Sequence, residues 1–194
     1  MQMTAKKAAA PAASPSQTLG TFLSAIRYED LPEPVVARTE ELFLAWFASA
    51  LAGKGARPVS VIDGFAAQMG PRDGPAENLL TRKRTSPFFA ALVNGAASHF
   101  VEQDDLHNSS VLHPGTVVFP AVLAAAQDVG ASGKELIAAS VAGYECGVRV
   151  GEFLGLALRL RDFLVVLSPL VSQEASSGSC DAKGESERAA AHHR

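Results

Sequence analysis

The chain has 194 residues, of which 47% are hydrophobic, 19% charged and 7% aromatic, a balance that excludes wholesale disorder and suits a globular core. Lys and Arg together number 17 against 20 for Asp and Glu, so the net charge is -3 and nucleic acid is excluded as the expected partner. Cys146 and Cys180 are too few for a disulfide framework or a four-thiolate metal centre, which predicts a reducing, cytoplasmic location.

Neither end of the chain reads as part of the core. Residues 1–16 are rich in Ala and Pro without the Leu-rich centre of a secretory signal, and we expect a flexible leader there. The apolar stretch 156–171 contains Arg159, Arg161 and Asp162 and falls short of the roughly 18 to 20 uncharged residues that cross a bilayer. We therefore expect no membrane association.

The first predicted helices follow the leader. Ser16 is expected to cap a short helix that ends before the loop 28–32. A long helix then begins at Pro34 and is expected to end at Gly53 in a left-handed conformation. Its apolar residues recur with the spacing of one buried stripe: Val35, Val36, Leu42, Phe43, Trp46, Phe47, Ala50 and Leu51.

Further helices are predicted over residues 58–69, 87–100 and 115–129, the last closed by Gly130, with a turn-rich loop at 70–75. A capping box formed by Ser132 and Glu135 opens another long helix. No segment from 17 to 153 alternates with period two, so the predicted class is all-α, with antiparallel packing of several helices. Residues 172–194 are polar and are expected to be poorly ordered.

Titratable side chains cluster between two of these helices. The cluster contains His99, Glu102, Asp104, Asp105, His107 and His113. A loop between buried helices can hold such groups over a cavity, and a histidine beside a carboxylate is equipped to move a proton near neutral pH.

His113 is the preferred acid or base. It precedes Pro114, which favours an extended backbone, and it lies at the start of a helix whose dipole attracts an anion such as a carboxylate. The alternative is a histidine that caps the helix or lies in solvent. His99 follows Leu92 by seven residues and is expected on the buried face, as a core histidine that Glu102 could orient.

Two other interpretations remain open for this segment. Asp104 and Asp105 are either pocket groups or solvated charges at a helix end. A metal site is the rival chemistry, although the spacing lacks HExxH or a clean run of two histidines and one carboxylate. Its possible ligands are His99, Asp104, His107 and His113.

The chain resembles the N-terminal helical domain of the MmgE/PrpD family over about residues 17–155. The motifs that carry the resemblance are Tyr28-Glu29-Asp30-Leu31-Pro32 with Val35-Val36, Leu51-Ala52-Gly53, Asn94-Gly95 with His99, Asp104-Asp105, His113-Pro114, Pro120-Ala121, Ser132-Gly133-Lys134-Glu135, Gly143-Tyr144-Glu145 and Arg149.

The resemblance implies an all-α N-terminal domain, a separate smaller α+β domain, a homodimer, and chemistry on small di- and tricarboxylates that needs no cofactor. The shared step is proton transfer at a carbon next to a carboxylate, which leads to dehydration of 2-methylcitrate, decarboxylation of cis-aconitate or epimerisation of iminodisuccinate.

The family pattern Asp-x-Asp-Asp-Thr-His, ending in His-Pro, also implies site residues. Glu102 stands for the first Asp and Leu106 for the Thr, whereas the other positions match. The implied catalytic residues are His113, Asp104 and Asp105. The implied substrate-binding residues are Glu102, His107, Arg149 and His99, and no metal is implied. Because Arg149 is the one obvious cation near the motif, most of an anion site would lie elsewhere.

The family pattern is not continued after Gly155, so residues 156–194 are expected to be a non-family tail, disordered or derived from a frameshift. This favours a truncated chain that lacks the α+β second domain and is inactive alone. Two alternatives are a helical binding or regulatory module that pairs with an intact homologue, and a metal-dependent helical hydrolase.

Overall fold

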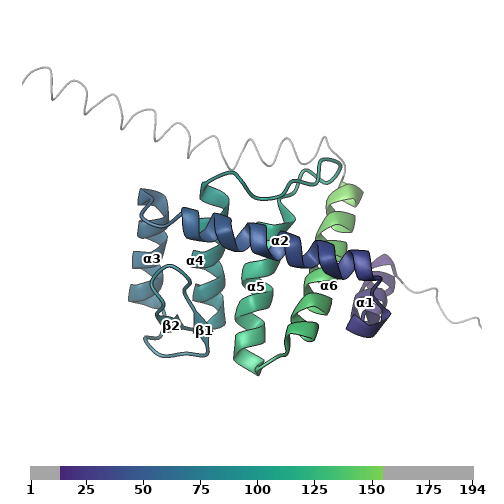
Figure 1. Cartoon of the computed structure of the whole chain (residues 1–194), viewed down its shortest axis with the longest axis horizontal. Coiled ribbons are helices and arrows are strands. Elements are labelled where there is room, and N and C mark those ends of the chain that lie inside the picture. The colour runs from purple at the N-terminus through teal and green to yellow at the C-terminus, as the bar shows by residue number, and fades with distance from the viewer. Residues whose placement is uncertain (1–13, 155–194) are drawn as a thin grey trace, which may run out of the picture.

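The computed structural model describes residues 14–154, in which a row of neighbouring helices is crossed by one long helix (Figure 1). The elements in chain order are α1 (Pro15–Ala25), η1 (Tyr28–Asp30), α2 (Glu33–Ala52), α3 (Arg57–Met69), β1 (Ala76–Glu77), β2 (Arg84–Thr85), α4 (Pro87–Phe100), α5 (Pro114–Val129) and α6 (Gly133–Leu154). The predicted all-α class is confirmed, with a short antiparallel pair of strands and an isolated bridge between His107 and Leu112 in addition. The expected tail lies outside the described residues.

The first helix, α1, begins earlier in the sequence than predicted. Ser14, not Ser16, caps α1: its hydroxyl accepts the Gln17 N–H at 3.2 Å, and its own N–H donates to the Gln17 side chain at 2.9 Å. Pro15 follows as the first helical residue, a position where its missing N–H costs nothing. Residues 14–16, expected in the leader, therefore belong to the cap and first turn of α1, and residues 1–13 lie outside the described part.

Helix α2 lies across α4, α5 and α6, in a row that α3 extends beyond the end of α2 (Figure 1). The centre of its predicted stripe is buried, with Trp46 and Ala50 packed on Leu79 and Phe119. The prediction is wrong at both ends of the stripe. Val35 is exposed in the first turn, away from the row, and Leu51 lies about 100° around the helix from Ala50, which turns it to solvent.

Consecutive helices α4, α5 and α6 are neighbours that run antiparallel (Figure 1). Gly130 ends α5 in the left-handed conformation predicted, with φ 68°. The capping box of α6 is confirmed, since Ser132 N–H donates to the Glu135 carboxylate at 2.7 Å and Glu135 N–H donates to the Ser132 hydroxyl at 3.4 Å. Gly53 was predicted wrongly: its φ is -71°, and a side chain is excluded there because a Cβ would collide with the Ala97 carbonyl.

The core follows the contacts between these helices. One cluster joins α3 to α4 and contains Val59, Ala66, Leu80, Val93 and Ala97. A second lies under α2 and contains Trp46, Ala50, Leu79 and Phe119. None of the helices between residues 14 and 154 combines the length and apolar character that a membrane span needs.

The segment between α4 and α5 packs on α6, and two glycines of α6 make room for it. A Cβ at Gly151 would lie 2.7 Å from the Ser110 Cβ, and a Cβ at Gly147 would lie 3.1 Å from a Leu112 methyl. The backbone turns sharply at both ends of this segment, where Glu102 and Val111 have φ of 49° and 47°. The fold thus brings the ends of α4 and α5 together beside α6.

Candidate active site at the junction of α4 and α5

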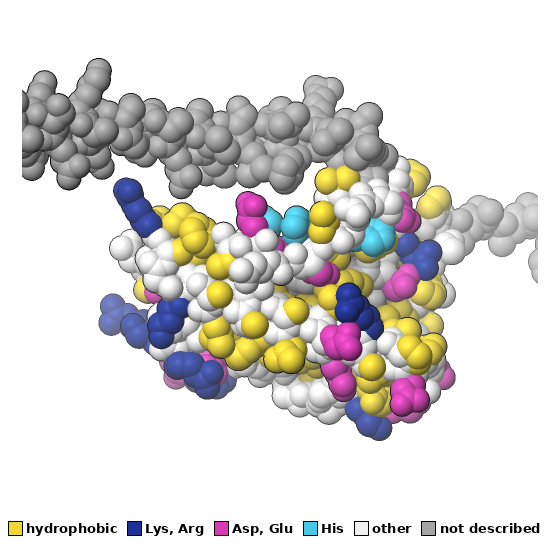
Figure 2. Space-filling view, turned by 45° about the horizontal axis from the view of Figure 1, so that its top comes forward, with side chains coloured by type: hydrophobic (Ala, Val, Ile, Leu, Met, Phe, Trp, Pro, Cys, Tyr) yellow, Lys and Arg dark blue, Asp and Glu magenta, His cyan; other side chains and the backbone are white. Residues whose placement is uncertain are grey.

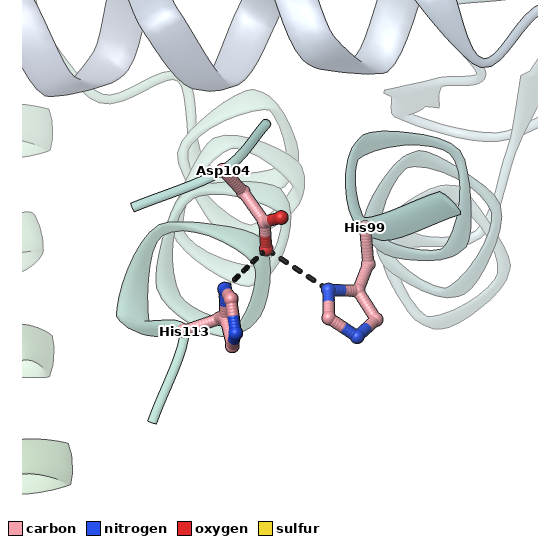
Figure 3. A group of neighbouring side chains, drawn as sticks. All are labelled: His99, Asp104 and His113. Carbon is pink, nitrogen blue, oxygen red and sulfur yellow. Dashed lines mark hydrogen bonds and ion pairs between the residues drawn. The ribbon is translucent and has the colours of Figure 1, made fainter. Parts of the chain in front are cut away.

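Histidine side chains reach the surface along one edge of the molecule, beside acidic side chains (Figure 2). Within this region, Figure 3 shows His99, Asp104 and His113 converging from three places. His99 lies in the last turn of α4, His113 is the residue before α5, and Asp104 lies in the segment between them. Residues 14 positions apart are therefore brought to one carboxylate.

One oxygen of Asp104 faces both imidazoles. Asp104 Oδ2 lies 2.9 Å from Nδ1 of His99 and 3.2 Å from Nδ1 of His113. The two rings are 5.1 Å apart between centroids and inclined at 64°. Because a carboxylate only accepts hydrogen bonds, the contact with His99 assigns the imidazole proton to Nδ1. Figure 3 shows the second nitrogen of each ring turned away from Asp104.

Burial differs sharply within the group. The Asp104 side chain is 1% exposed, whereas those of His99 and His113 are 50% and 34% exposed. Two buried atoms, Asp104 Oδ1 and His113 Nδ1, have no hydrogen-bond partner among the described residues. His113 Nδ1 is close enough to Oδ2 for an ion pair, but its approach does not meet hydrogen-bond geometry. The group thus combines a buried carboxylate with two imidazoles that are accessible from one side.

Asp105 has different partners from Asp104 and joins α5 to α6. It accepts the Gly115 N–H on Oδ1 and the Tyr144 hydroxyl on Oδ2, both at 2.9 Å. Burial, followed by the charge and hydrogen bond of Asp105, raises the pKa of Tyr144 well above its ordinary value. The anion that the sequence led us to expect at the start of α5 is therefore supplied by the Asp105 carboxylate of the chain itself.

Two predictions about this segment are wrong. His99 is half exposed, because it lies in the same direction as Leu92, which is itself 37% exposed, while Ala97 and Ser98 fill the buried face of α4. Asp104 occupies the position beside His99 that was expected of Glu102, and its burial excludes the solvated helix-end charge that the sequence had left open as one of two alternatives. Glu102 is exposed, since its left-handed backbone turns the chain there.

The other candidate residues lie apart from this group. His107 Nδ1 accepts the Ser110 N–H at 3.3 Å and lies 2.9 Å from the Ser110 hydroxyl, which holds the turn between them. Arg149 pairs with Glu145, with Nε 2.8 Å from its carboxylate, and lies over the Phe22 ring of α1. The roles of both in binding a substrate remain predictions.

The contact between Tyr144 and Asp105 could not be found from the sequence, because 39 residues separate the two. Neither residue stands at a helical or capping distance from the other, so local spacing holds no signal for the pair. Tyr144 and Asp105 both occur in the motifs that carry the family resemblance, but the motifs do not indicate that the two residues are in contact.

Sequence comparison finds relatives of this chain in two Aspergillus species. The cis-aconitate decarboxylase-like protein oryM of Aspergillus oryzae is 30% identical over 152 residues, covering 73% of this chain and 30% of that protein. The cis-aconitate decarboxylase of Aspergillus terreus is 29% identical over 136 residues, covering 68% of this chain and 28% of the enzyme. The chain thus spans less than a third of the length of these relatives.

The family comparison covers most of the chain. The family model described as the MmgE/PrpD N-terminal domain matches residues 17–173. This match includes the whole of α2 to α6 and the group formed by His99, Asp104 and His113. The chain belongs to the MmgE/PrpD family, through its N-terminal domain.

Proposed function

We propose that this chain carries the proton-transferring group of a lyase or isomerase that acts on small di- or tricarboxylates, in the manner of a 2-methylcitrate dehydratase. One observation carries the proposal: a buried carboxylate, Asp104, faces Nδ1 of two histidines whose other nitrogens point away from it. A carboxylate in this position fixes the orientation and tautomer of an imidazole and stabilises the imidazolium that forms when Nε2 takes a proton.

The proposed reaction begins at a carbon next to a substrate carboxylate. His113 Nε2 removes the proton from this carbon or delivers one to it, and Asp104 balances the charge that His113 gains. His99 lies beside His113 and shares the same carboxylate oxygen, so we assign it to hold the substrate or to relay the proton. Asp105 keeps His113 in place through Gly115 at the start of α5.

The substrate class comes from the relatives and from the requirements of the chemistry. Both Aspergillus relatives are named for decarboxylation of cis-aconitate, a tricarboxylate. Binding such an anion takes several cations. Arg149 pairs with Glu145, and we therefore place most of the anion-binding groups outside residues 14–154. A homodimer, a cytoplasmic location and independence of cofactors complete the proposal.

The test joins residues 1–155 of this chain to the part of the Aspergillus terreus enzyme that follows its matching region. The fusion and the unmodified chain are incubated with cis-aconitate or 2-methylcitrate in D₂O, and proton NMR follows both turnover and exchange at the carbon. We expect the fusion to act and the unmodified chain to show no measurable turnover, because we place most of the anion-binding groups in the part that the fusion adds.

His113→Gln in the fusion should lower kcat by about 10² to 10⁴-fold, the range for a lost general acid or base, with a smaller change in KM. His107→Gln is the comparison variant: this histidine bonds to Ser110 and is expected from the family resemblance to bind substrate, so KM should change more than kcat. Full activity of His113→Gln would contradict the assignment. If both variants of the fusion remain folded and only His99→Gln is inactive, then His99 is the acid or base.

A second candidate function is a helical module that pairs with an intact homologue. It is favoured by the apolar face between α4 and α5, where Phe88 and Val117 are 68% and 58% exposed beside Leu92 and Ala121. Exposed apolar surface of this kind promotes association. Sedimentation of the chain, alone and with a full-length relative, distinguishes specific pairing from self-association. A chain that is monomeric in both samples counts against this role.

A further inference from the structure

We propose that His99, Asp104 and His113 form a binding site for one divalent transition-metal ion, with Zn²⁺ as the ion of choice. The site uses the two Nδ1 atoms and the carboxylate of Asp104, which lie within 4.8 Å of one another. Neutral imidazole and carboxylate are ligands that Zn²⁺ takes in proteins. Binding at this site is independent of any reaction that the enzyme performs.

The distances between the ligand atoms suit such an ion. Bonds of about 2.0 to 2.2 Å to nitrogen and oxygen place neighbouring ligands of a tetrahedral Zn²⁺ roughly 3.3 to 3.5 Å apart, and octahedral ligands nearer 3 Å. The two Nδ1 atoms lie 2.9 Å and 3.2 Å from Asp104 Oδ2. All three ligand atoms lie within 4.8 Å of one another, so side-chain rotations that shorten the longest separation by up to about 1.4 Å bring them to coordination distance.

Two buried atoms of the group also point to a ligand. Asp104 Oδ1 and His113 Nδ1 are buried and lack hydrogen-bond partners among the described residues. A polar atom left in this state costs about 1 to 3 kcal/mol relative to a satisfied one. A cation held by Asp104 Oδ2 and by His113 Nδ1 would satisfy the histidine nitrogen, and it would also satisfy Oδ1 if the carboxylate bound through both oxygens; the hydrogen bond from His99 satisfies neither atom.

The surroundings allow an ion to enter and to complete its coordination. The side chains of His99 and His113 are 50% and 34% exposed, while that of Asp104 is 1% exposed. The carboxylate therefore lies at the buried end of the site, and the imidazoles lie at the end that solvent reaches. Water molecules supply the remaining ligands from that side. Asp104 contributes the one negative charge of the site, which favours a cation over a neutral ligand.

Metal binding changes the protonation of both histidines. Each Nδ1 must present its lone pair to the ion, so its proton moves to Nε2. A ring protonated at Nε2 and bound at Nδ1 can no longer accept a proton. If the proposed function is correct, Zn²⁺ therefore inhibits proton transfer, and this consequence, unlike binding itself, rests on that function.

The experiment measures binding directly, on the full chain. His192 and His193 near the C-terminus are replaced by Gln in every protein tested, because adjacent histidines bind Zn²⁺ on their own. Calorimetric titration with ZnCl₂ at neutral pH should give one ion per chain. Asp104→Asn and His99→Gln should each weaken binding by at least about tenfold, whereas His107→Gln should leave it within about twofold.

A second measurement identifies the ligands without any substitution in the site. Nitrogen-15 NMR of histidine side chains should show Zn²⁺ shifting the Nδ1 signals of His99 and His113 and leaving that of His107 unchanged. The site is refuted if the titrations of Asp104→Asn and of the parent coincide, or if no histidine in the folded part responds. Because neither readout uses turnover, a failed metal site and a failed catalytic proposal give separate results.

Discussion

Removal of the Tyr144 hydroxyl isolates the bond that joins α6 to the start of α5. Tyr144→Phe keeps the ring that packs on Phe119, 5.4 Å away between centroids, and deletes the donor to Asp105. A hydrogen bond to a charged acceptor contributes roughly 1.5 to 3 kcal/mol, and near neutral pH we expect the free energy of unfolding to fall by that amount. Asp105 then retains the Gly115 N–H alone.

The pH dependence of this loss follows from the raised pKa of Tyr144. Burial and Asp105 raise it above the ordinary value of 10.0, so the folded state keeps this proton when the unfolded state begins to lose it. Stability from Tyr144 is thus complete below pH 10.0 and is lost as the pH rises further. Between about pH 8 and pH 11 the parent should lose about 1.4 kcal/mol that the variant does not.

Urea unfolding followed by far-ultraviolet circular dichroism at the two pH values measures both effects. Tyr28→Phe is the matched control, because Tyr28 lies under the Lys134 ammonium and its hydroxyl has no hydrogen bond among the described residues. The control should change the free energy of unfolding by less than about 0.5 kcal/mol near pH 8. A Tyr144→Phe deficit that is absent near pH 8, or that stays constant up to pH 11, would refute the reasoning.

Three further substitutions test local features of the fold. Glu135→Gln removes a carboxylate whose pKa the hydrogen bonds from Ser132 hold below the ordinary 4.5, so the parent's advantage in thermal stability near pH 7 should disappear as the pH falls below 4.5. Gly64→Ala adds a Cβ with no neighbour within 4 Å inside α3 and should raise stability by roughly 0.5 to 1 kcal/mol. Gly53→Ala should lower it by about 1 to 3 kcal/mol, because its Cβ meets the Ala97 carbonyl, and equal unfolding midpoints for these two variants would contradict the packing.

Features that depend on neighbours in the sequence could be predicted. The left-handed Gly130 and the capping box of Ser132 and Glu135 involve residues at most three positions apart, so local sequence patterns are sufficient to predict them. The pairing of β1 with β2 could not be predicted, since two-residue strands such as Ala76–Glu77 are too short to show any alternation. The crossing of α2 over the row depends on packing between distant residues, which periodicity alone does not report.

The sequence could indicate which segment holds the candidate site, but not which of its residues touch one another. Clustering singled out six residues of this segment, and the structure brings His99, Asp104 and His113 of these together. Helical spacing then suggested Glu102 as the partner of His99, on the assumption that α4 continues. The helix ends at Phe100 and the chain turns at Glu102, where φ is 49°, so Asp104 returns to His99 instead.

The glycines of α6 have a consequence for how the molecule opens. Gly143, Gly147 and Gly151 stand four residues apart and receive Val118 of α5, Leu112 and Ser110. Each glycine lowers the intrinsic helix stability by about 1 kcal/mol relative to alanine, so α6 depends on these neighbours for its helicity. The segment between α4 and α5 and the C-terminal half of α6 should therefore unfold together as one cooperative unit. Amide hydrogen exchange along α6 would then report whether a ligand at His113 has tightened the segment that carries it.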